Sequence, residues 1–370
     1  MITAEWPARP TGLLALCAVT LAAAPTVAQQ PVVEVSGDVS CGECRITMDT
    51  VVTLGGLDGP GSHLLEGPVP LAVVDQRGRI LLAMWGRADI AVFDSTGAFI
   101  REMGGSGEGP GEYALITHLN VGPEFIHVFD GLRGRTVLDA DHGVVRADRF
   151  RADITSAAVT ESETVVFAGD LPTSESVGHK LHLLGGDGDI RSYGWDGSVY
   201  RGPSGQQFAV AANDSSAWIV DGASGRIEEW VLLPEPKLSR ILNRSVEQFD
   251  REIREPPTWP NVANIGAKLD DQGLWILWWG PDPAWTRRTS DPEVANQWER
   301  EAPGQTLYDG VLDLIDPETG RTLARYRSDL SLPGFVYGSD MVIAYEETQA
   351  GVPWIHLLRP TVHGLASRTR

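Results

Sequence analysis

The chain has 370 residues, of which 42% are hydrophobic, and it carries 41 Gly, 24 Pro and 12 Trp. This length and apolar content suffice for a full hydrophobic core and argue against an intrinsically disordered chain. The formal net charge is −20, from 30 basic and 50 acidic side chains. Such an acidic surface repels phosphate backbones and anionic lipid headgroups, so we expect neither nucleic acid nor a membrane surface as a partner.

The N-terminus is typical of a secretory signal peptide over residues 1–28. An apolar run from Leu13 to Ala24 is too short to span a bilayer, and the small residues of Thr26-Val27-Ala28 suit a cleavage site. Cys17 follows Leu16, which is too large for lipoprotein processing, so Cys17 is expected to leave with the peptide. No later segment is apolar for long enough to form a transmembrane helix. We therefore expect a periplasmic or secreted protein.

Two cysteines remain in the mature chain, Cys41 and Cys44, in the sequence Cys-Gly-Glu-Cys. A zinc half-site would need a second Cys-x-x-Cys or a close His pair, and the sequence has neither. A redox dithiol would be expected in a thioredoxin-like βαβ context, whereas the flanking residues here are strand-like. The oxidising compartment favours a local structural disulfide between the two.

Strand-like segments recur along the mature chain, separated by polar turns about every ten residues. The predicted strands are 71–75, 80–84, 90–93 and 99–103; 117–122, 126–129, 136–139 and 144–150; 154–159, 164–168, 180–184 and 190–194; 208–212, 217–220 and 226–232, with a fourth that the pattern does not place; 264–269, 274–279, 311–316 and 322–326; and 334–337, 341–345 and 353–358. A four-stranded unit that is repeated about every 40 to 60 residues is typical of propeller blades.

The sixth unit lacks a fourth strand, and residues 46–54 near the N-terminus form a spare one. Pairing this strand with the last unit would close a ring and leave no exposed sheet edge. We therefore expect a single domain over residues 29–370.

Two segments near the fifth unit have helical rather than strand patterns. Ser245-Val246-Glu247-Gln248 and Ser290-Asp291-Pro292-Glu293 are capping-box signals for the start of a helix. We expect insertions at about 239–260 and 281–306 to form a small helical cap over one mouth of the ring.

A hairpin and its connector carry a family resemblance. A strand ends in Phe93-Asp94, a turn leads to Gly97, and a glycine-rich connector runs from Gly105 to Tyr113 as Gly-Ser-Gly-Glu-Gly-Pro-Gly-Glu-Tyr. This segment resembles the bacterial six-bladed β-propeller family of the NHL-repeat type, with Tyr113 in place of the usual Phe. The resemblance covers about residues 41–360. It implies an all-β fold of six four-stranded antiparallel blades, an architecture that hosts lyases, lactonases and binding modules alike.

The glycines of the connector also suggest a phosphate-binding loop. A Walker loop ends in Gly-Lys-Ser/Thr, and a Rossmann fingerprint is followed by a helix. Glu112-Tyr113 supplies neither, and Glu108 and Glu112 would repel phosphate. The connector is therefore interpreted as a tight crossover between two blades, with glycine supplying positive φ.

A metal site is the next possibility, because calcium-dependent propeller lactonases hold their ion at the central mouth with oxygen ligands. Asp75, Asp130, Asp221 and Asp270 lie near strand ends or turns, where Asp usually caps its own turn. The eight His residues show no metal-ligand spacing, and no Gly-x-Ser-x-Gly elbow is present. We assign no catalytic residue, no metal ligand and no cofactor, and calcium belongs only to the alternative function below.

Six tryptophans fall within 40 residues: Trp259, Trp275, Trp278, Trp279, Trp285 and Trp298. Trp275 and Trp279 share one face of a predicted strand and Trp278 the other, so some of these indoles pack within the blade. The predicted ligand site consists of Trp259, Trp279, Trp285 and Trp298 with Arg287 and Arg288. An aromatic pocket with a polar rim suits a sugar ring, a peptide or an apolar ligand.

The sequence is therefore interpreted as a monomeric, exported, non-enzymatic binding module at the cell envelope, for a small molecule, glycan, peptide or protein that it does not identify. The alternative is a metal-dependent hydrolase or lyase of lactonase type with its site at the central channel. Three or more carboxylate or amide side chains that converge at the channel mouth would favour the enzyme. A channel lined by apolar and small residues would favour binding.

Overall fold

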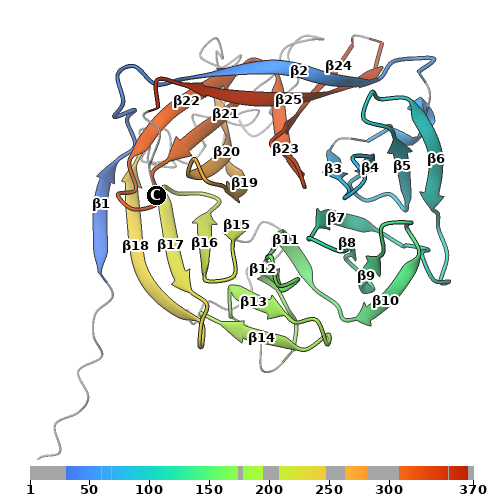
Figure 1. The fold of residues 1–370 in the computed structure, drawn as a ribbon, viewed down its shortest axis with the longest axis horizontal. Coiled ribbons are helices and arrows are strands. Elements are labelled where there is room, and N and C mark those ends of the chain that lie inside the picture. The colour runs from blue at the N-terminus through green and yellow to red at the C-terminus, as the bar shows by residue number, and fades with distance from the viewer. Residues whose placement is uncertain are drawn as a thin grey trace, which may run out of the picture.

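The computed structural model describes residues 31–59, 61–67, 69–173, 178–194, 208–246, 263–281, 308–348 and 350–365. They contain 25 β-strands and a short 3₁₀ helix, Ser62–Leu64. The strands form sheets that surround a common axis as the blades of a β-propeller (Figure 1). No helix in this part of the chain is both long and apolar enough to cross a membrane.

Within the described residues, the sheets divide into six four-stranded antiparallel units, which we number as blades 1 to 6. They are β3–β6 (Pro70–Val74, Ile80–Met84, Asp89–Phe93, Phe99–Gly104), β7–β10 (Ile116–Val121, Ile126–Asp130, Gly134–Leu138, Val144–Arg149), β11–β14 (Asp153–Val159, Val165–Asp170, Leu181–Leu184, Ile190–Tyr193), β15–β18 (Phe208–Ala212, Ser216–Asp221, Arg226–Val231, Lys237–Ser245), β19–β22 (Ala263–Leu269, Leu274–Pro281, Tyr308–Ile315, Thr322–Ser328) and β23–β25 with β2 (Ser331–Tyr337, Val342–Glu347, Pro353–His363, Arg45–Gly55). A short parallel pairing of β23 with β3 joins blades 6 and 1 into one eight-stranded sheet.

The hydrophobic core lies between neighbouring blades. The second strands of blades 1 and 2, β4 (ILLAM) and β8 (IHVFD), are buried along their whole length. Successive side chains point to opposite faces of a blade, so each blade packs against both of its neighbours. Val92 of β5 shares a cluster with Val128 of β8, whereas Phe129 packs on the other face with Phe167 of β12. The core is therefore a ring of apolar layers, one between each pair of blades that share a cluster.

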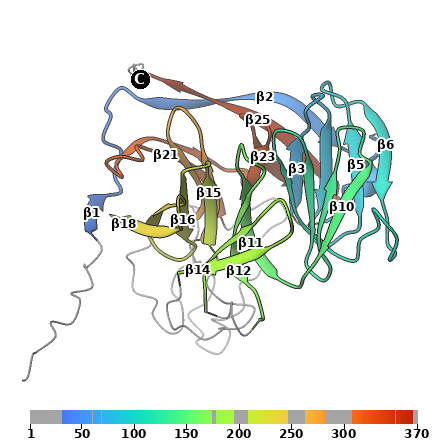
Figure 2. The ribbon, with the colours of Figure 1, turned by 60° about the horizontal axis from the view of Figure 1, so that its bottom comes forward.

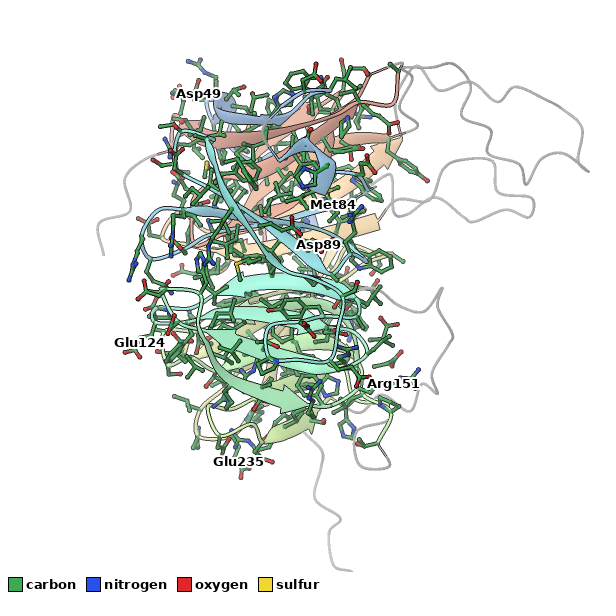
Figure 3. The ribbon with its side chains drawn as sticks, turned by 90° about the vertical axis from the view of Figure 1, so that its right-hand side faces the viewer. Asp49, Met84, Asp89, Glu124, Arg151 and Glu235 are labelled. Atoms are coloured by element: carbon green, nitrogen blue, oxygen red, sulfur yellow. A yellow bond between two sulfur atoms is a disulfide. The ribbon has the colours of Figure 1, made fainter. Side chains whose placement is uncertain are left out.

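The two faces of the ring differ in their connections. On one face, which we call the turn face, short polar turns such as Asp75–Gly78 join consecutive strands of a blade. On the opposite face, which we call the connector face, the chain passes from one blade to the next, as between Gly104 and Ile116. In Figure 3, Glu124 from the β7–β8 turn and Arg151 from the link between blades 2 and 3 lie on opposite sides of the ring.

Residues 32–55, which we call the N-terminal strap, cross the outer edges of three successive blades. Strand β1 (Val32–Ser36) pairs parallel with β18 of blade 4, and Val39 forms an isolated bridge to Thr322 of blade 5. Strand β2 then pairs antiparallel with β25 of blade 6, and the two run side by side in Figures 1 and 2. The predicted disulfide between Cys41 and Cys44 is present in the strap, with an S–S distance of 2.02 Å.

A buried ionic network lies beneath the strap. Arg244 of β18 donates a 2.9 Å hydrogen bond to Asp313 of β21, and Arg325 of β22 donates a 2.6 Å hydrogen bond to the other oxygen of the same carboxylate. Arg325 and Thr322 each donate a 3.1 Å hydrogen bond to the Gly37 carbonyl of the strap. Blades 4 and 5 and the strap therefore share one set of buried charges.

The structure corrects one part of the predicted helical insertions. Residues 239–245 belong to β18, the fourth strand of blade 4 that the sequence pattern did not place. Leu242 pairs with Ile227 of β17, and this pairing outweighs the local capping signal at Ser245. The rest of both predicted insertions, residues 247–260 and 282–306, lies outside the described residues, and the described residues contain no α-helix.

Candidate functional site

Polar side chains on the inner strands join neighbouring or facing blades. Asn120 of β7 donates a 2.8 Å hydrogen bond to the Ala157 carbonyl of β11. The Tyr337 hydroxyl of β23 faces Ser156 of β11, and burial raises the pKa of Tyr337 to about 12, so this hydroxyl stays protonated. Among the described residues, no group of three or more His, Cys, Asp or Glu side chains is placed to hold a metal ion.

The four aspartates considered as metal ligands cap their own turns. Asp75 accepts hydrogen bonds from the backbone N–H groups of Arg77 and Arg79, at 2.9 Å each. Asp130, Asp221 and Asp270 likewise accept from the N–H two residues ahead, at 2.8 to 2.9 Å. Their carboxylates stabilise the turns that join the strands, as is common for Asp at these positions.

Of the six residues predicted to bind a ligand, the structure describes Trp279. It lies half-buried on β20, and its ring centroid is 6.0 Å from that of Tyr308, with the planes tilted by 32°. The other predicted site residues lie outside the described residues: Trp259, Trp285, Arg287, Arg288 and Trp298. Trp275 and Trp278 are buried in the interfaces that blade 5 forms with its neighbours.

The glycine-rich connector forms one wall of a small recess on the connector face. Gly104 (φ 87°) and Gly105 (φ 111°) turn the chain after β6 in a conformation that favours glycine. The Tyr113 N–H donates a 2.9 Å hydrogen bond to the Gly105 carbonyl, which closes the loop. This geometry is the tight crossover that the sequence predicted. It places the ring of Tyr113, which is 1% exposed, in the interface between blades 1 and 2.

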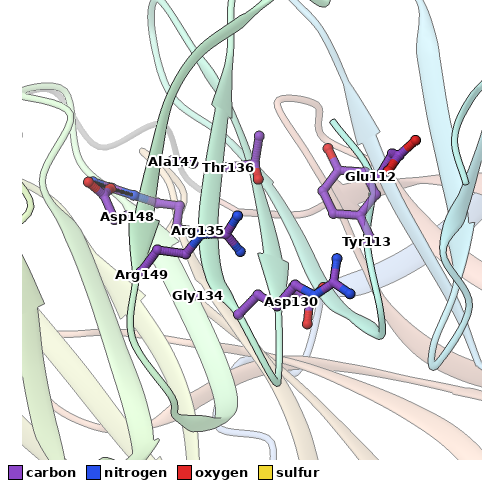
Figure 4. A pocket seen from close by; sticks show the side chains of 10 residues that line it. Glu112, Tyr113, Asp130, Gly134, Arg135, Thr136, Ala147, Asp148 and Arg149 are labelled. Carbon is purple, nitrogen blue, oxygen red and sulfur yellow. Dashed lines mark hydrogen bonds and ion pairs between the residues drawn. The ribbon is translucent and has the colours of Figure 1, made fainter. Parts of the chain in front are cut away.

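The opposite wall of the recess comes from the outer strands of blade 2. In the register between β9 and β10, Thr136 and Arg149 lie on the face directed at the connector. Arg135 and Asp148 alternate with them and form an ion pair of 2.5 Å on the other face. Figure 4 shows Tyr113 on one side of the recess and Thr136 and Arg149 on the other.

The loop between β8 and β9 forms the floor of the recess and holds the connector in place. The Asp130 carboxylate accepts hydrogen bonds from the N–H groups of Ala114, at 2.6 Å, and Leu132, at 2.9 Å. Arg133 donates to the Gly107 carbonyl of the connector. The recess is therefore built from two segments that meet only because blades 1 and 2 are packed together.

An apolar patch lies beside the recess on the connector face. Trp85, at the end of β4, is 48% exposed, and Leu132 is 57% exposed. Half-buried Leu115 lies near the residue next to each of them: a Cβ built on Gly86, which follows Trp85, or on Gly131, which precedes Leu132, would be 3.6 Å from its δ-methyl groups. We call Trp85, Leu115 and Leu132 the apolar patch. The patch is next to the recess in sequence, because Leu132 directly precedes Arg133 and Leu115 follows Tyr113 by two residues.

Sequence reasoning identified the connector but not the residues that complete this site. Arg133 and Arg149 follow ordinary turn and strand patterns, and Trp85 is a single residue after an apolar strand. The one feature of the sequence that could have indicated the site was Trp85, which follows an apolar strand and precedes the glycine-rich connector. It has meaning only once the blades are assembled.

Comparison with known proteins agrees with the architecture. A family model described as a 6-bladed beta-propeller matches residues 57–136. No curated protein matches the chain. The chain is similar in structure to a protein described as exported from Bacteroides fragilis (TM-score 0.51, 13% identity, covering 89% of this chain and 99% of that one).

A second solved structure, a member of the duf4221 family from Bacteroides vulgatus, gives a TM-score of 0.54 at 9% identity and covers 86% of this chain and 99% of that one. At these identities the likeness shows the fold alone. The family description, the solved structures and the strand pairing all place this chain among the β-propellers.

Proposed function

We propose that this chain is an exported ligand-binding module, a six-bladed propeller of the NHL-repeat type whose ring closes through β2 and β25. In this proposal, a signal peptide directs it to the periplasm or the exterior, and it binds a small ligand on the connector face between blades 1 and 2. The observation that carries the proposal is the exposure of Trp85 and Leu132 near Leu115.

A tryptophan that is half exposed on a folded surface gains free energy when a ligand covers it. Covering the exposed halves of Trp85 and Leu132 would contribute about 1 kcal/mol for each side chain. Together with the recess beside it, the apolar patch has the usual composition of a small-ligand site, in which apolar surface adjoins a few oriented polar groups. Polar side chains on the inner strands, by contrast, are used to join blades.

The proposal is tested with the neutral fluorescent probe N-phenyl-1-naphthylamine, whose emission rises in apolar surroundings. We expect the mature protein to bind it saturably, and the double variant Trp85→Ala/Leu132→Ala to bind it at least tenfold more weakly. Ile100→Ala is the matched control, because Ile100 is 49% exposed on β6, outside the apolar patch. Equal binding by the wild type and a folded double variant would refute the proposed site.

A further inference from the structure

We propose that the connector recess is an oxyanion site that takes the carboxylate or phosphate head group of an amphipathic ligand. The inference rests on the proposed function, because the apolar body of the same ligand would lie on the apolar patch. The ligand would then carry a negative charge, although the net charge of the protein, −20, repels anions in general.

The groups that face the recess are mainly hydrogen-bond donors. The side chain of Arg149 makes no ion pair or hydrogen bond within the described part of the chain, and Arg133 uses one N–H on the Gly107 carbonyl. The hydroxyls of Tyr113 and Thr136 lie between the connector and blade 2. Burial raises the pKa of Tyr113 well above its ordinary value, so its hydroxyl remains a donor at any physiological pH.

Three acidic residues line the recess: Asp148 is paired with Arg135, and the other two accept hydrogen bonds from the backbone. Both oxygens of Asp130 accept N–H groups, from Ala114 on one side and Leu132 on the other. Glu112 is folded back on the connector, where one oxygen accepts a 2.7 Å hydrogen bond from the Gly109 N–H. These hydrogen bonds fix the direction in which each carboxylate points.

The glutamates of the connector were expected to repel an anion, but one of them, Glu112, is folded against its own loop. The carboxylate of Glu112 is directed at Gly107 and Gly109, whereas the guanidinium of Arg149, which has no partner among the described residues, comes from the opposite wall. A guanidinium can donate two parallel hydrogen bonds to a carboxylate or phosphate, and such charge-assisted bonds are about twice as strong as neutral ones. The recess therefore combines a fixed donor wall with one arginine whose side chain has no partner in the part of the chain that the structure describes.

The recess has a cavity volume of about 10 Å³, which is room for one water-sized group, so a head group would lie at its mouth. Its walls are formed by Tyr113 on one side and by Thr136 on the other. A planar carboxylate or a phosphate at the mouth would reach Arg133 and Arg149, while any ring or chain attached to it must extend over Leu132, the neighbour of Arg133. An amphipathic anion is the ligand class that fits both features.

The test compares two probes that share one aromatic body. 8-Anilinonaphthalene-1-sulfonate carries an oxyanion that N-phenyl-1-naphthylamine lacks. At low salt we expect the wild type to bind the sulfonate at least tenfold more tightly than the neutral probe, and Arg149→Gln to bring this ratio close to one without changing neutral-probe affinity. Arg151→Gln is the matched control, because Arg151 is also exposed on the connector face but lies outside the recess.

The outcomes separate this inference from the proposed function. If the neutral probe binds the apolar patch but Arg149→Gln leaves the ratio unchanged, the oxyanion site is refuted and the binding module stands. If only the sulfonate binds, and its binding depends on Arg149, the oxyanion site is supported and the apolar patch is refuted. If neither probe binds, both proposals fail. Displacement of the sulfonate probe by dodecanoate or by dodecyl phosphate identifies the head group, and displacement by neither refutes the oxyanion site.

Discussion

Replacing Asp313 with Ala is expected to destabilise the propeller strongly, through the arginine that it leaves behind. The side chain of Arg244 is 3% exposed and that of Asp313 is 1% exposed, so the two charges are almost fully removed from water. Burial lowers the pKa of Arg244, and the neighbouring Asp313 counteracts that effect. Without the carboxylate, a buried guanidinium would keep only its 2.8 Å hydrogen bond to the Thr322 hydroxyl.

The magnitude follows from this loss of the counter-ion. Removing one partner of a buried ion pair costs about 3 to 5 kcal/mol, because the remaining charge is not solvated. Arg325, whose side chain is 25% exposed, can turn toward water and should contribute less to the cost than Arg244. We therefore expect Asp313→Ala to lower the free energy of unfolding by about 3 to 5 kcal/mol.

Urea unfolding followed by circular dichroism measures this change. Asp340→Ala is the matched control, because the ion pair of Asp340 with Arg359 is exposed and is expected to contribute about 1 kcal/mol or less. The double variant Arg244→Met/Asp313→Leu removes both charges and should recover at least half of the loss, since apolar replacement of a buried pair is often tolerated. A loss of stability for Asp313→Ala no greater than that of the control would refute the reasoning.

Two further predictions concern a buried histidine and the disulfide. Burial lowers the pKa of His182 to about 4, from an ordinary value of 6.5. The fold therefore favours the neutral imidazole, and its contribution is complete above pH 6.5 and is lost as the pH falls toward 4. The wild type should lose free energy of unfolding between pH 7 and pH 4, and in urea unfolding His182→Gln should make this loss smaller by about 3 kcal/mol. A loss as large in the variant as in the wild type would contradict this. Replacing Cys41 and Cys44 with Ser should cost about 2 kcal/mol in the chain-entropy model. A reductant should cause the same loss in the wild type, and a loss in neither case would disprove a structural role.

The strands of blade 1 were predicted within one residue of their observed ends, because their signals are local. Residues 71–75 and 80–84 were expected, and the structure has Pro70–Val74 and Ile80–Met84. A short run of consecutive apolar residues predicts each strand, and an Asp followed by Gly78, with φ 76°, predicts the turn between them. Both features can be read from a few consecutive residues.

Strand β1 escaped prediction because its pairing with β18 joins distant parts of the chain. Asn243 of β18 donates a 2.9 Å hydrogen bond to Glu34 of β1, across 209 residues of sequence. The short segment Val32–Ser36 follows the predicted signal peptide and has no turn or partner nearby. Its strand character depends on an edge that only the folded blade 4 supplies.

The candidate site was predictable only in part, for the same reason. The connector was identified from its glycines, but its partner Arg149 comes from the last strand of the next blade. The aromatic cluster, which the sequence favoured as the site, is represented in the described residues by Trp279, whose neighbour Tyr308 lies on the adjacent strand. Residues that converge from different blades leave no common local pattern.

The pairing of β2 with β25 also sets the order in which the protein can fold. Thr47 and His363 are joined by a 3.0 Å hydrogen bond although 316 residues separate them. Closing a loop of this length costs about 5 kcal/mol of chain entropy. Contacts between residues that are close in sequence do not offset this cost, because they form without closing the loop. One of the earliest strands to be synthesised must therefore wait as an open edge until one of the last arrives. The final blade can form only after translation has reached β25.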